Sequence, residues 1–212
     1  MEITELSEYK GETWKLELDN DREQTYFINA SVVSDNLLKK GQELSGEALA
    51  QIVSSDTLRK AKRRALYLLG TKQYCSAELL KKLRPTYGGE ISRKAVEYMC
   101  ELGYVNDEDY APKLADYLIH TKRFGLRKAR YEMLHRGLSE NLVDEALAAF
   151  GEEEIDEEIT ELLLRKYYAK LEDYDDRRRT IAALARRGYD YRSVKRCIEK
   201  LLDNYEDDED FE

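Results

Sequence analysis

Apolar and polar residues alternate over the first part of the chain. The segment 13–18 places large apolar side chains at every second position, and the segment 25–33 is rich in aromatic and β-branched residues. Residues 19–22, which lie between these segments, have the composition of a turn. A period of two on either side of a turn predicts a β-hairpin.

A short helix is expected to follow this hairpin. Ser45 is a favourable N-cap residue, and the residues after it up to Val53 are mostly helix formers. Together, the hairpin and the helix predict a small β-containing module over residues 1–56.

From residue 57 onward, the spacing of apolar residues becomes helical. Two junctions share one order of residues: a glycine that takes the left-handed position after a helix, an apolar residue, and then a Ser or Asp that caps the next helix. After each cap, apolar residues follow at the fourth, eighth and eleventh positions, which lie on one helical face. The first junction is Gly137-Leu138-Ser139 with Val143, Leu147 and Phe150; the second is Gly188-Tyr189-Asp190 with Val194, Ile198 and Leu201.

A looser junction follows Leu83, where we expect Ser92 to cap the helix that contains Val96 and Cys100. Leu83 aligns with Leu134 and Leu184, at separations of 51 and 50 residues. A period near 50 residues is typical of stacked helical repeats. We therefore predict a mainly α fold, in which three tandem three-helix repeats form an elongated, curved array behind the β-hairpin-containing module.

The punctuation between helices sets the expected boundaries. We place the repeats at residues 57–106, 107–151 and 152–202. Residues 203–212 contain seven acidic residues and no basic ones, so they are too charged to pack, and we expect a disordered tail.

The joint between the first two expected repeats combines a helix stop with a helix start. A glycine supplies the left-handed residue, an asparagine suits the N-cap, and the acidic residues that follow suit the positive end of the next helix. The valine before this cap and the tyrosine after it are spaced for a hydrophobic staple. A direct role in binding a partner is the alternative to this structural role. The residues of the joint are Gly103, Tyr104, Val105, Asn106, Asp107 and Tyr110.

Charge is unevenly distributed along the chain, whose formal net charge is −9. Residues 1–57 carry a net charge of −7, residues 58–150 a net charge of +6, and residues 151–212 a net charge of −8. A basic middle between acidic ends argues against a plain duplex-DNA binder and is compatible with a surface for a charged partner.

Two groups of basic residues in this middle region are candidates for partner binding. Their members recur at helical spacing, so each group is expected to form a basic helix face. A solvated face that binds nothing is the alternative interpretation. The candidates are Arg59, Lys60, Arg63 and Arg64 in the first group, and Arg123, Arg127, Lys128 and Arg130 in the second.

Residues for catalysis, cofactors or metals are not evident. Cys75, Cys100 and Cys197 lie far apart, which disfavours a disulfide framework or a zinc site, and we expect them to be small buried residues. His120 and His135 lack the spacing of metal ligands, and no phosphate-binding glycine loop occurs. The chain also has no leader pattern and no apolar run near the roughly 18 residues of a membrane helix. We expect a soluble, cytoplasmic, monomeric protein without enzymatic activity.

Several short segments resemble one known family. The string Gly103-Tyr-Val-Asn-Asp107, followed by an aromatic residue and Ala111, resembles the best-known motif of the RecX family. The segment from Ser76 to Leu83 resembles the first repeat of that family, and Arg123-x-Gly125 with its basic continuation resembles the second. The resemblance covers residues 57–202, and residues 1–56 more loosely. Family members carry Arg where this chain has Tyr67 and Ile where it has Ala129, which leaves exact contact residues open.

The resemblance implies a regulatory protein of DNA repair, DNA recombination and the SOS response. Such proteins bind RecA and the RecA–DNA filament and inhibit the ATPase, strand-exchange and coprotease activities of RecA. The two basic faces would then line a concave surface that meets acidic RecA side chains or DNA phosphates. The alternatives are a helical-repeat module with weak, sequence-independent affinity for single- or double-stranded DNA, and a generic protein-interaction scaffold.

Overall fold

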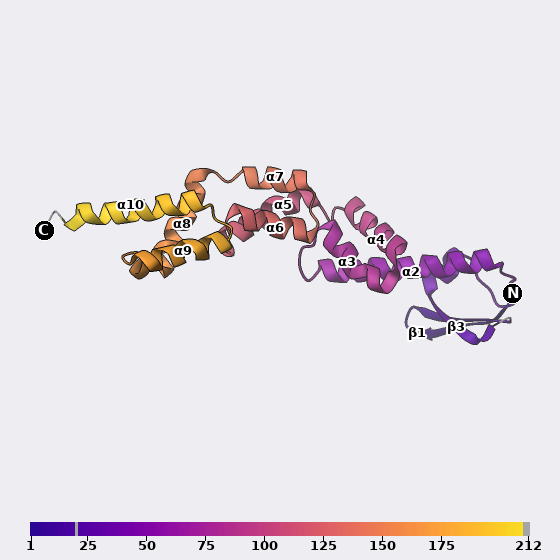
Figure 1. Cartoon of the computed structure of the whole chain (residues 1–212). Coiled ribbons are helices and arrows are strands. Elements are labelled where there is room, and N and C mark those ends of the chain that lie inside the picture. The colour runs from indigo at the N-terminus through magenta and orange to yellow at the C-terminus, as the bar shows by residue number, and fades with distance from the viewer. Residues whose placement is uncertain (20, 210–212) are drawn as a thin grey trace. The chain divides into compact units, whose positions relative to one another are not determined.

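The computed structural model describes residues 1–19 and 21–209 and divides into two compact units. The first unit contains residues 1–73 and 79–105, and the second contains residues 74–78 and those from 106 onward. Most of the chain is helical, with one small sheet near the N-terminus (Figure 1). The predicted class, helical repeats behind a β-containing module, is confirmed.

The N-terminal sheet has three antiparallel strands in the order β1 (Ile3–Lys10), β2 (Thr13–Leu18) and β3 (Asp21–Asn29). The predicted hairpin is confirmed as the pairing of β2 with β3, for example Leu16 opposite Tyr26. The sequence analysis missed β1, whose pairing with β2 shifts register between Ile3 and Glu5. Such an irregularity interrupts the period of two that reveals a strand.

The predicted second strand of the hairpin extends too far, to residue 33. The strand ends at Asn29, and helix α1 (Ala30–Asp35) begins directly after it. The Asn29 side chain caps this helix by accepting a hydrogen bond from the Ser31 backbone N–H at 2.9 Å. Val32 and Val33, which read as strand residues, are buried in the core that α1 shares with the sheet. A local cap therefore overrides β propensity here.

Helix α2 (Gly46–Leu69) connects the N-terminal module to the first repeat. Ser45 caps it as predicted, accepting from the Ala48 N–H at 3.1 Å. The helix continues through residues 56 and 57, where the sequence analysis placed a boundary, because no Gly or Pro interrupts it before Gly70. Ile52 packs against the sheet, and α2 also packs against α4 (Gly89–Glu101).

The junction between α3 (Ser76–Tyr87) and α4 differs from the prediction. Gly88, with φ of +77°, ends the turn, so Ser92 lies inside α4, fully buried, instead of capping it. Met99 consequently occupies the buried face, and Cys100, predicted to be buried, is exposed. The helix therefore begins at Gly89, three residues before the serine that was predicted to cap it.

The second unit contains two repeats whose junctions follow the prediction. Gly137 and Gly188 have φ of +96° and +91°. The Ser139 hydroxyl accepts from the Leu142 N–H, and the Asp190 carboxylate accepts from the Arg192 N–H at 2.8 Å. The second repeat comprises α5 (Asp107–Asp116), the π-helix η1 (Tyr117–Thr121), α6 (Leu126–Arg136) and α7 (Glu140–Ala148); the third comprises α8 (Glu152–Lys166), the short 3-10 helix η2 (Tyr168–Lys170), α9 (Tyr174–Arg186) and α10 (Tyr191–Glu209).

Helix α10 continues to Glu209, beyond residue 203, where the sequence analysis predicted the start of a disordered tail. A helix that has already formed adds each further residue at little cost, so an acidic continuation can remain helical. Residues 210–212 lie outside the described residues.

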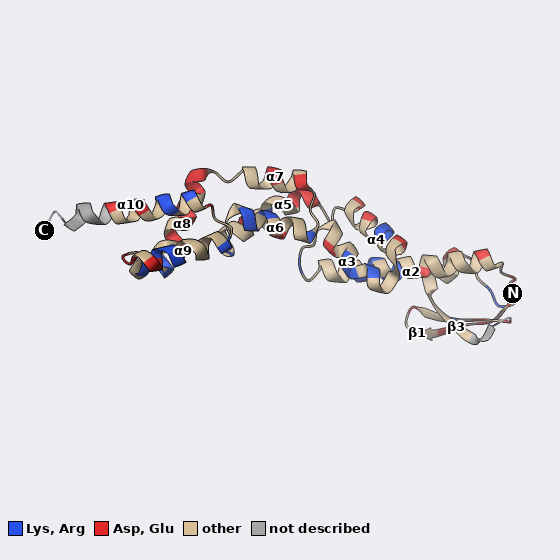
Figure 2. Cartoon of the chain, viewed as in Figure 1, with Lys and Arg blue, Asp and Glu red and all other residues tan. Residues whose placement is uncertain are grey.

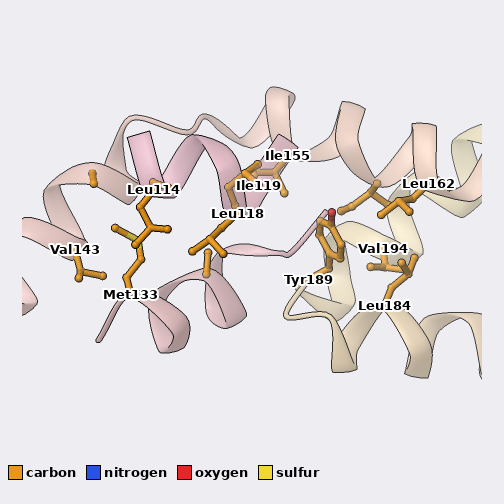
Figure 3. Packing of buried hydrophobic residues seen from close by; sticks show 14 of the residues in the cluster. Leu114, Leu118, Ile119, Met133, Val143, Ile155, Leu162, Leu184, Tyr189 and Val194 are labelled. Atoms are coloured by element: carbon orange, nitrogen blue, oxygen red, sulfur yellow. The ribbon is translucent and has the colours of Figure 1, made fainter. Parts of the chain in front are cut away.

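One hydrophobic core runs through both repeats of the second unit. Leu118 and Ile119 of η1 pack in the same cluster as Leu162 of α8 and Val194 of α10, with Tyr189 among them (Figure 3). Each such fully buried aliphatic side chain contributes about 1.5–3 kcal/mol of transfer free energy. In the described part of the chain, no helix combines the length and apolarity that crossing a membrane requires.

Candidate partner-binding site

The predicted basic residues of α2 are exposed. Figure 2 colours the Lys and Arg positions of the chain blue. Arg59 and Arg63 form no ion pair, hydrogen bond or ring contact with any described residue. Lys60 donates to the Phe27 carbonyl at 3.0 Å and pairs with the Asp56 carboxylate at 2.6 Å. Arg64 lies over the Tyr67 ring, 5.0 Å from its centroid. Two of the four candidates on α2 are therefore unengaged cations.

The carboxylate that holds Lys60 is itself part of the framework. Asp56 is only 3% exposed and also accepts from the Asn29 backbone N–H at 2.8 Å. A buried carboxylate requires such partners, because an unpaired buried charge is strongly unfavourable. Lys60 thus serves to join α2 to the end of β3, and its ammonium group is occupied within the chain.

A pocket of about 310 Å³ lies on the same side of α2. Its walls come from α2, from α4, and from residues at the start of β2 and the end of β3. Lys62 lies over the Tyr98 ring, with its ammonium nitrogen 3.4 Å from the ring centroid, so its charge is also partly satisfied. The lining residues are Glu12, Thr13, Ile28, Asn29, Arg59, Lys60, Lys62, Arg63, Leu66 and Tyr98.

The second predicted basic group lies in the second unit, and its arginines form ion pairs within the chain. Arg123 pairs with Glu158 and, at 2.7 Å, with Glu161, both on α8. Arg127 pairs with Asp190, the cap of α10, at 2.6 Å. These arginines therefore link the second repeat to the third.

The remaining members of this group are also engaged. Arg130 makes two hydrogen bonds to the Asp144 carboxylate, at 2.9 and 3.4 Å, and so ties α6 to α7. Lys128 places its ammonium nitrogen 4.1 Å from the centroid of the Phe124 ring. Intramolecular contacts thus occupy the charges of all four candidates between residues 123 and 130.

The backbone beneath this group forms a close joint between the repeats. The Gly125 N–H donates to the Arg187 carbonyl at 2.9 Å, and the Arg127 N–H donates to the Gly188 carbonyl at 3.3 Å. The carbonyl end of α9 therefore satisfies N–H groups at the start of α6. A Cβ atom on Gly125 would lie 2.3 Å from the backbone of residues 188 and 189, so only glycine fits.

The same kind of joint occurs at the other end of α6. Cys75, just before α3, donates its thiol hydrogen to the Arg136 carbonyl at a sulfur–oxygen distance of 3.3 Å. A Cβ atom on Gly137 would lie 2.5 Å from the Cβ atom of Ala77. Burial raises the pKa of the Cys75 thiol, which favours the neutral form. Cys75 is thus a packing residue, as predicted, and Cys197 is buried as well.

A buried carboxylate organises the interface between the second and third repeats. Glu158 is 8% exposed and lies between Arg123 and His120. The His120 Nδ1 atom is 2.8 Å from the Glu158 Oε1 atom. The hydrogen bond to Glu158 raises the pKa of His120, and the carboxylates of Asp116 and Glu154 add to this effect. Its charged neighbours therefore favour the protonated imidazole.

The predicted joint residues end one helix and begin another. Gly103 has φ of +74°, its N–H donates to the Cys100 carbonyl, and the Tyr104 N–H donates to the Met99 carbonyl at 2.9 Å. This pattern of hydrogen bonds is a Schellman motif. Asn106 caps α5 by accepting from the N–H groups of residues 108 and 109, as predicted. Val105 is buried, and its predicted staple with Tyr110 stays a prediction.

Asp107 and Tyr110 also hold the first residues of α3. The Asp107 carboxylate accepts from the Ser76 backbone N–H at 2.8 Å and from its hydroxyl at 2.5 Å. The Tyr110 hydroxyl accepts from Arg136 at 2.8 Å and donates to Glu78 at 3.4 Å. Burial raises the pKa of Tyr110, which keeps it neutral. These contacts give both residues the structural role assigned to the joint.

Sequence reasoning missed the acidic partners that decide which arginines are available. Glu158 and Asp190 lie 35 and 63 residues from the arginines they bind, beyond any local pattern. It also left Tyr98 out, although a tyrosine beside a lysine-rich helix is a potential cation–π partner. Within the described residues, no group of three or more His, Cys, Asp or Glu side chains is arranged to hold a metal ion.

The second unit matches two family models. Residues 106–147 match the second three-helix domain of RecX, and residues 152–198 match the third three-helix domain of RecX. Along the whole chain, a protein of Clostridioides difficile named "Regulatory protein RecX" is 23% identical over 94% of this chain and 95% of its own length. A protein of the same name from Streptococcus gordonii is 28% identical over 100% of this chain and 81% of its own length.

Solved structures agree with this fold. A crystal structure of regulatory protein RecX superimposes with a TM-score of 0.69 at 21% identity, covering 92% of this chain and 97% of the other. RecX from Lactobacillus salivarius gives a TM-score of 0.63 at 19% identity, covering 69% of this chain and 97% of the other. The joint motif, the helical repeats and these comparisons agree, and the chain is similar to RecX family proteins along its length.

Proposed function

We propose that this chain is a non-enzymatic regulator that binds RecA and RecA–DNA filaments and inhibits the ATPase, strand-exchange and coprotease activities of RecA. The observation that carries the proposal is similarity to proteins named as regulatory over 94% to 100% of the chain. We propose RecA as the partner because the resemblance to the RecX family implies this partner.

The architecture is suited to regulation by binding. Repeats that bury their faces against each other offer a large surface from few residues. In the second unit, the ion pairs and the close Gly125–Gly188 approach hold neighbouring repeats in one arrangement. A stiff ligand that contacts more than one RecA protomer hinders the movements that accompany ATP turnover, which accounts for inhibition without catalysis.

The test is a titration of the single-stranded-DNA-dependent ATPase rate of RecA with the purified chain. We expect inhibition at substoichiometric ratios, because one bound molecule affects several protomers of a filament. A mechanism restricted to one-to-one capture of free RecA would instead require equimolar protein.

The control is a circular dichroism spectrum, which verifies that the purified protein is folded and helical. If folded protein at several-fold molar excess leaves the ATPase rate unchanged, the proposal is wrong, and a generic protein-interaction scaffold becomes the better interpretation. Tight binding of duplex DNA at physiological salt without RecA would favour the DNA-binding alternative.

A further inference from the structure

We propose that the pocket between α2, α4 and the ends of β2 and β3 binds an acidic peptide segment of the protein partner. In this site, Arg59 and Arg63 pair with carboxylates, and Leu66 contacts a neighbouring apolar side chain. The inference rests on the proposed function only in requiring a protein partner, and it assigns a binding site to the first unit.

Two guanidinium groups of this pocket are available to a ligand. Arg59 and Arg63 are four residues apart on α2, so they lie about 5–6 Å apart at Cβ on one helix face. Both are exposed and have no partner among the described residues. A guanidinium fork matches the two oxygens of a carboxylate and binds it through paired hydrogen bonds.

The two lysines of the pocket are held in place by contacts within the chain. Lys60 is fixed by Asp56 and the Phe27 carbonyl, and Lys62 lies over the Tyr98 ring. These contacts position α2 against the sheet and against α4. The arginines therefore project from a supported wall, so less entropy is lost when they bind a ligand.

The lining of the pocket is partly apolar. Leu66 is 43% exposed at the pocket, and the side chain of Ile28, 2% exposed, belongs to the core behind it. A pocket of about 310 Å³ accommodates only a few side chains. An acidic residue next to an aromatic or aliphatic residue satisfies both the charged and the apolar part of this surface.

The surroundings favour a peptide over a nucleic acid. Glu12 lines the same pocket, and residues 1–57 carry a net charge of −7. A strand of regularly spaced phosphates meets this acidic surface, whereas a short peptide can place its carboxylates at the arginines alone. In addition, Lys62 covers one face of the Tyr98 ring, which obstructs base stacking on that face.

The experiment uses the full chain and two probes: a fluorescein-labelled synthetic peptide, Glu-Glu-Phe-Glu-Glu with blocked termini, and an equally labelled oligothymidylate of twelve nucleotides. Binding is measured by fluorescence anisotropy for the wild type and for Arg59→Ala/Arg63→Ala. The control is Lys81→Ala/Lys82→Ala, which removes the same charge from exposed positions of α3 outside the pocket. We expect peptide affinity to fall about tenfold or more in the arginine variant and to be unchanged in the control.

Equal loss in both variants, or no peptide binding by the wild type, overturns the inference. It is likewise overturned if the oligothymidylate binds more tightly than the peptide and depends on the same two arginines. The ATPase titration separates the two proposals. Arginine-dependent peptide binding without RecA inhibition supports the pocket and removes the proposed function, whereas RecA inhibition without peptide binding does the reverse.

Discussion

The two basic segments of this chain look alike in sequence and differ in structure. Residues 59–64 and residues 123–130 each carry four candidate cations at helical spacing. On α2, Arg59 and Arg63 are exposed and have no partner among the described residues. In the second unit, Arg123, Arg127 and Arg130 all pair with carboxylates that are distant in sequence.

Helical spacing of basic residues therefore does not identify a binding face. What matters is whether the fold brings carboxylates within reach. Glu158, Glu161 and Asp190 approach the second segment, so its charges join repeats. Near α2, Asp56 is already shared between Lys60 and a backbone N–H, which leaves the arginines available.

The largest expected effect comes from breaking the backbone joint beneath the second segment. In Gly125→Ala, the added methyl group would lie 2.3 Å from backbone atoms of residues 188 and 189, so the repeats must move apart. We expect the free energy of unfolding of the second unit to fall by about 3 kcal/mol. Hydrogen–deuterium exchange of peptides from this unit measures the loss.

Gly151→Ala is the matched control, because a Cβ atom there meets no atom within 4 Å and φ is −73°. Its effect should stay within about 1 kcal/mol, the usual difference between Gly and Ala at an N-cap. Equal protection from exchange in the two variants would show that the joint tolerates a side chain and contradict the close-packing argument.

An intermediate effect should separate the two segments directly. Arg123→Gln leaves the buried Glu158 with His120 as its remaining cationic partner, and we expect about 2 kcal/mol of destabilisation. Arg59→Gln removes an unpaired surface charge, so the change should be within about 0.5 kcal/mol. Urea unfolding followed by circular dichroism compares the variants; similar midpoints would refute the distinction drawn between the segments.

The smallest effect is a pH dependence that arises at His120, which pairs with the same carboxylate as Arg123. Because Glu158 raises the pKa of His120 above 6.5, the ion pair stabilises the folded state fully below pH 6.5 and is lost as pH rises through the folded pKa. The unfolding midpoint of the wild type should therefore exceed that of His120→Gln at low pH, and this difference should shrink as pH rises. A difference that stays constant with pH would mean that protonation of His120 does not contribute.

Much of the fold was predictable where a few neighbouring residues decide it. The left-handed glycines at 103, 137 and 188, and the caps at Asn106 and Ser139, were all predicted correctly. The errors arose where two local signals competed. Helix α4 begins at Gly89 instead of after Ser92, and the Asn29 cap overrides the β propensity of Val32.

Local sequence patterns were enough to predict the fold class and the helix ends at Gly103, Gly137 and Gly188, because hydrophobic spacing and caps act over a few residues. Which cations are available to a ligand depends instead on contacts that form in the folded chain. Arg123 meets Glu158 across 35 residues and Arg127 meets Asp190 across 63, whereas Arg59 and Arg63 meet no described carboxylate. Charge pairing depends on distance in space, and the fold brings together groups that no local pattern connects.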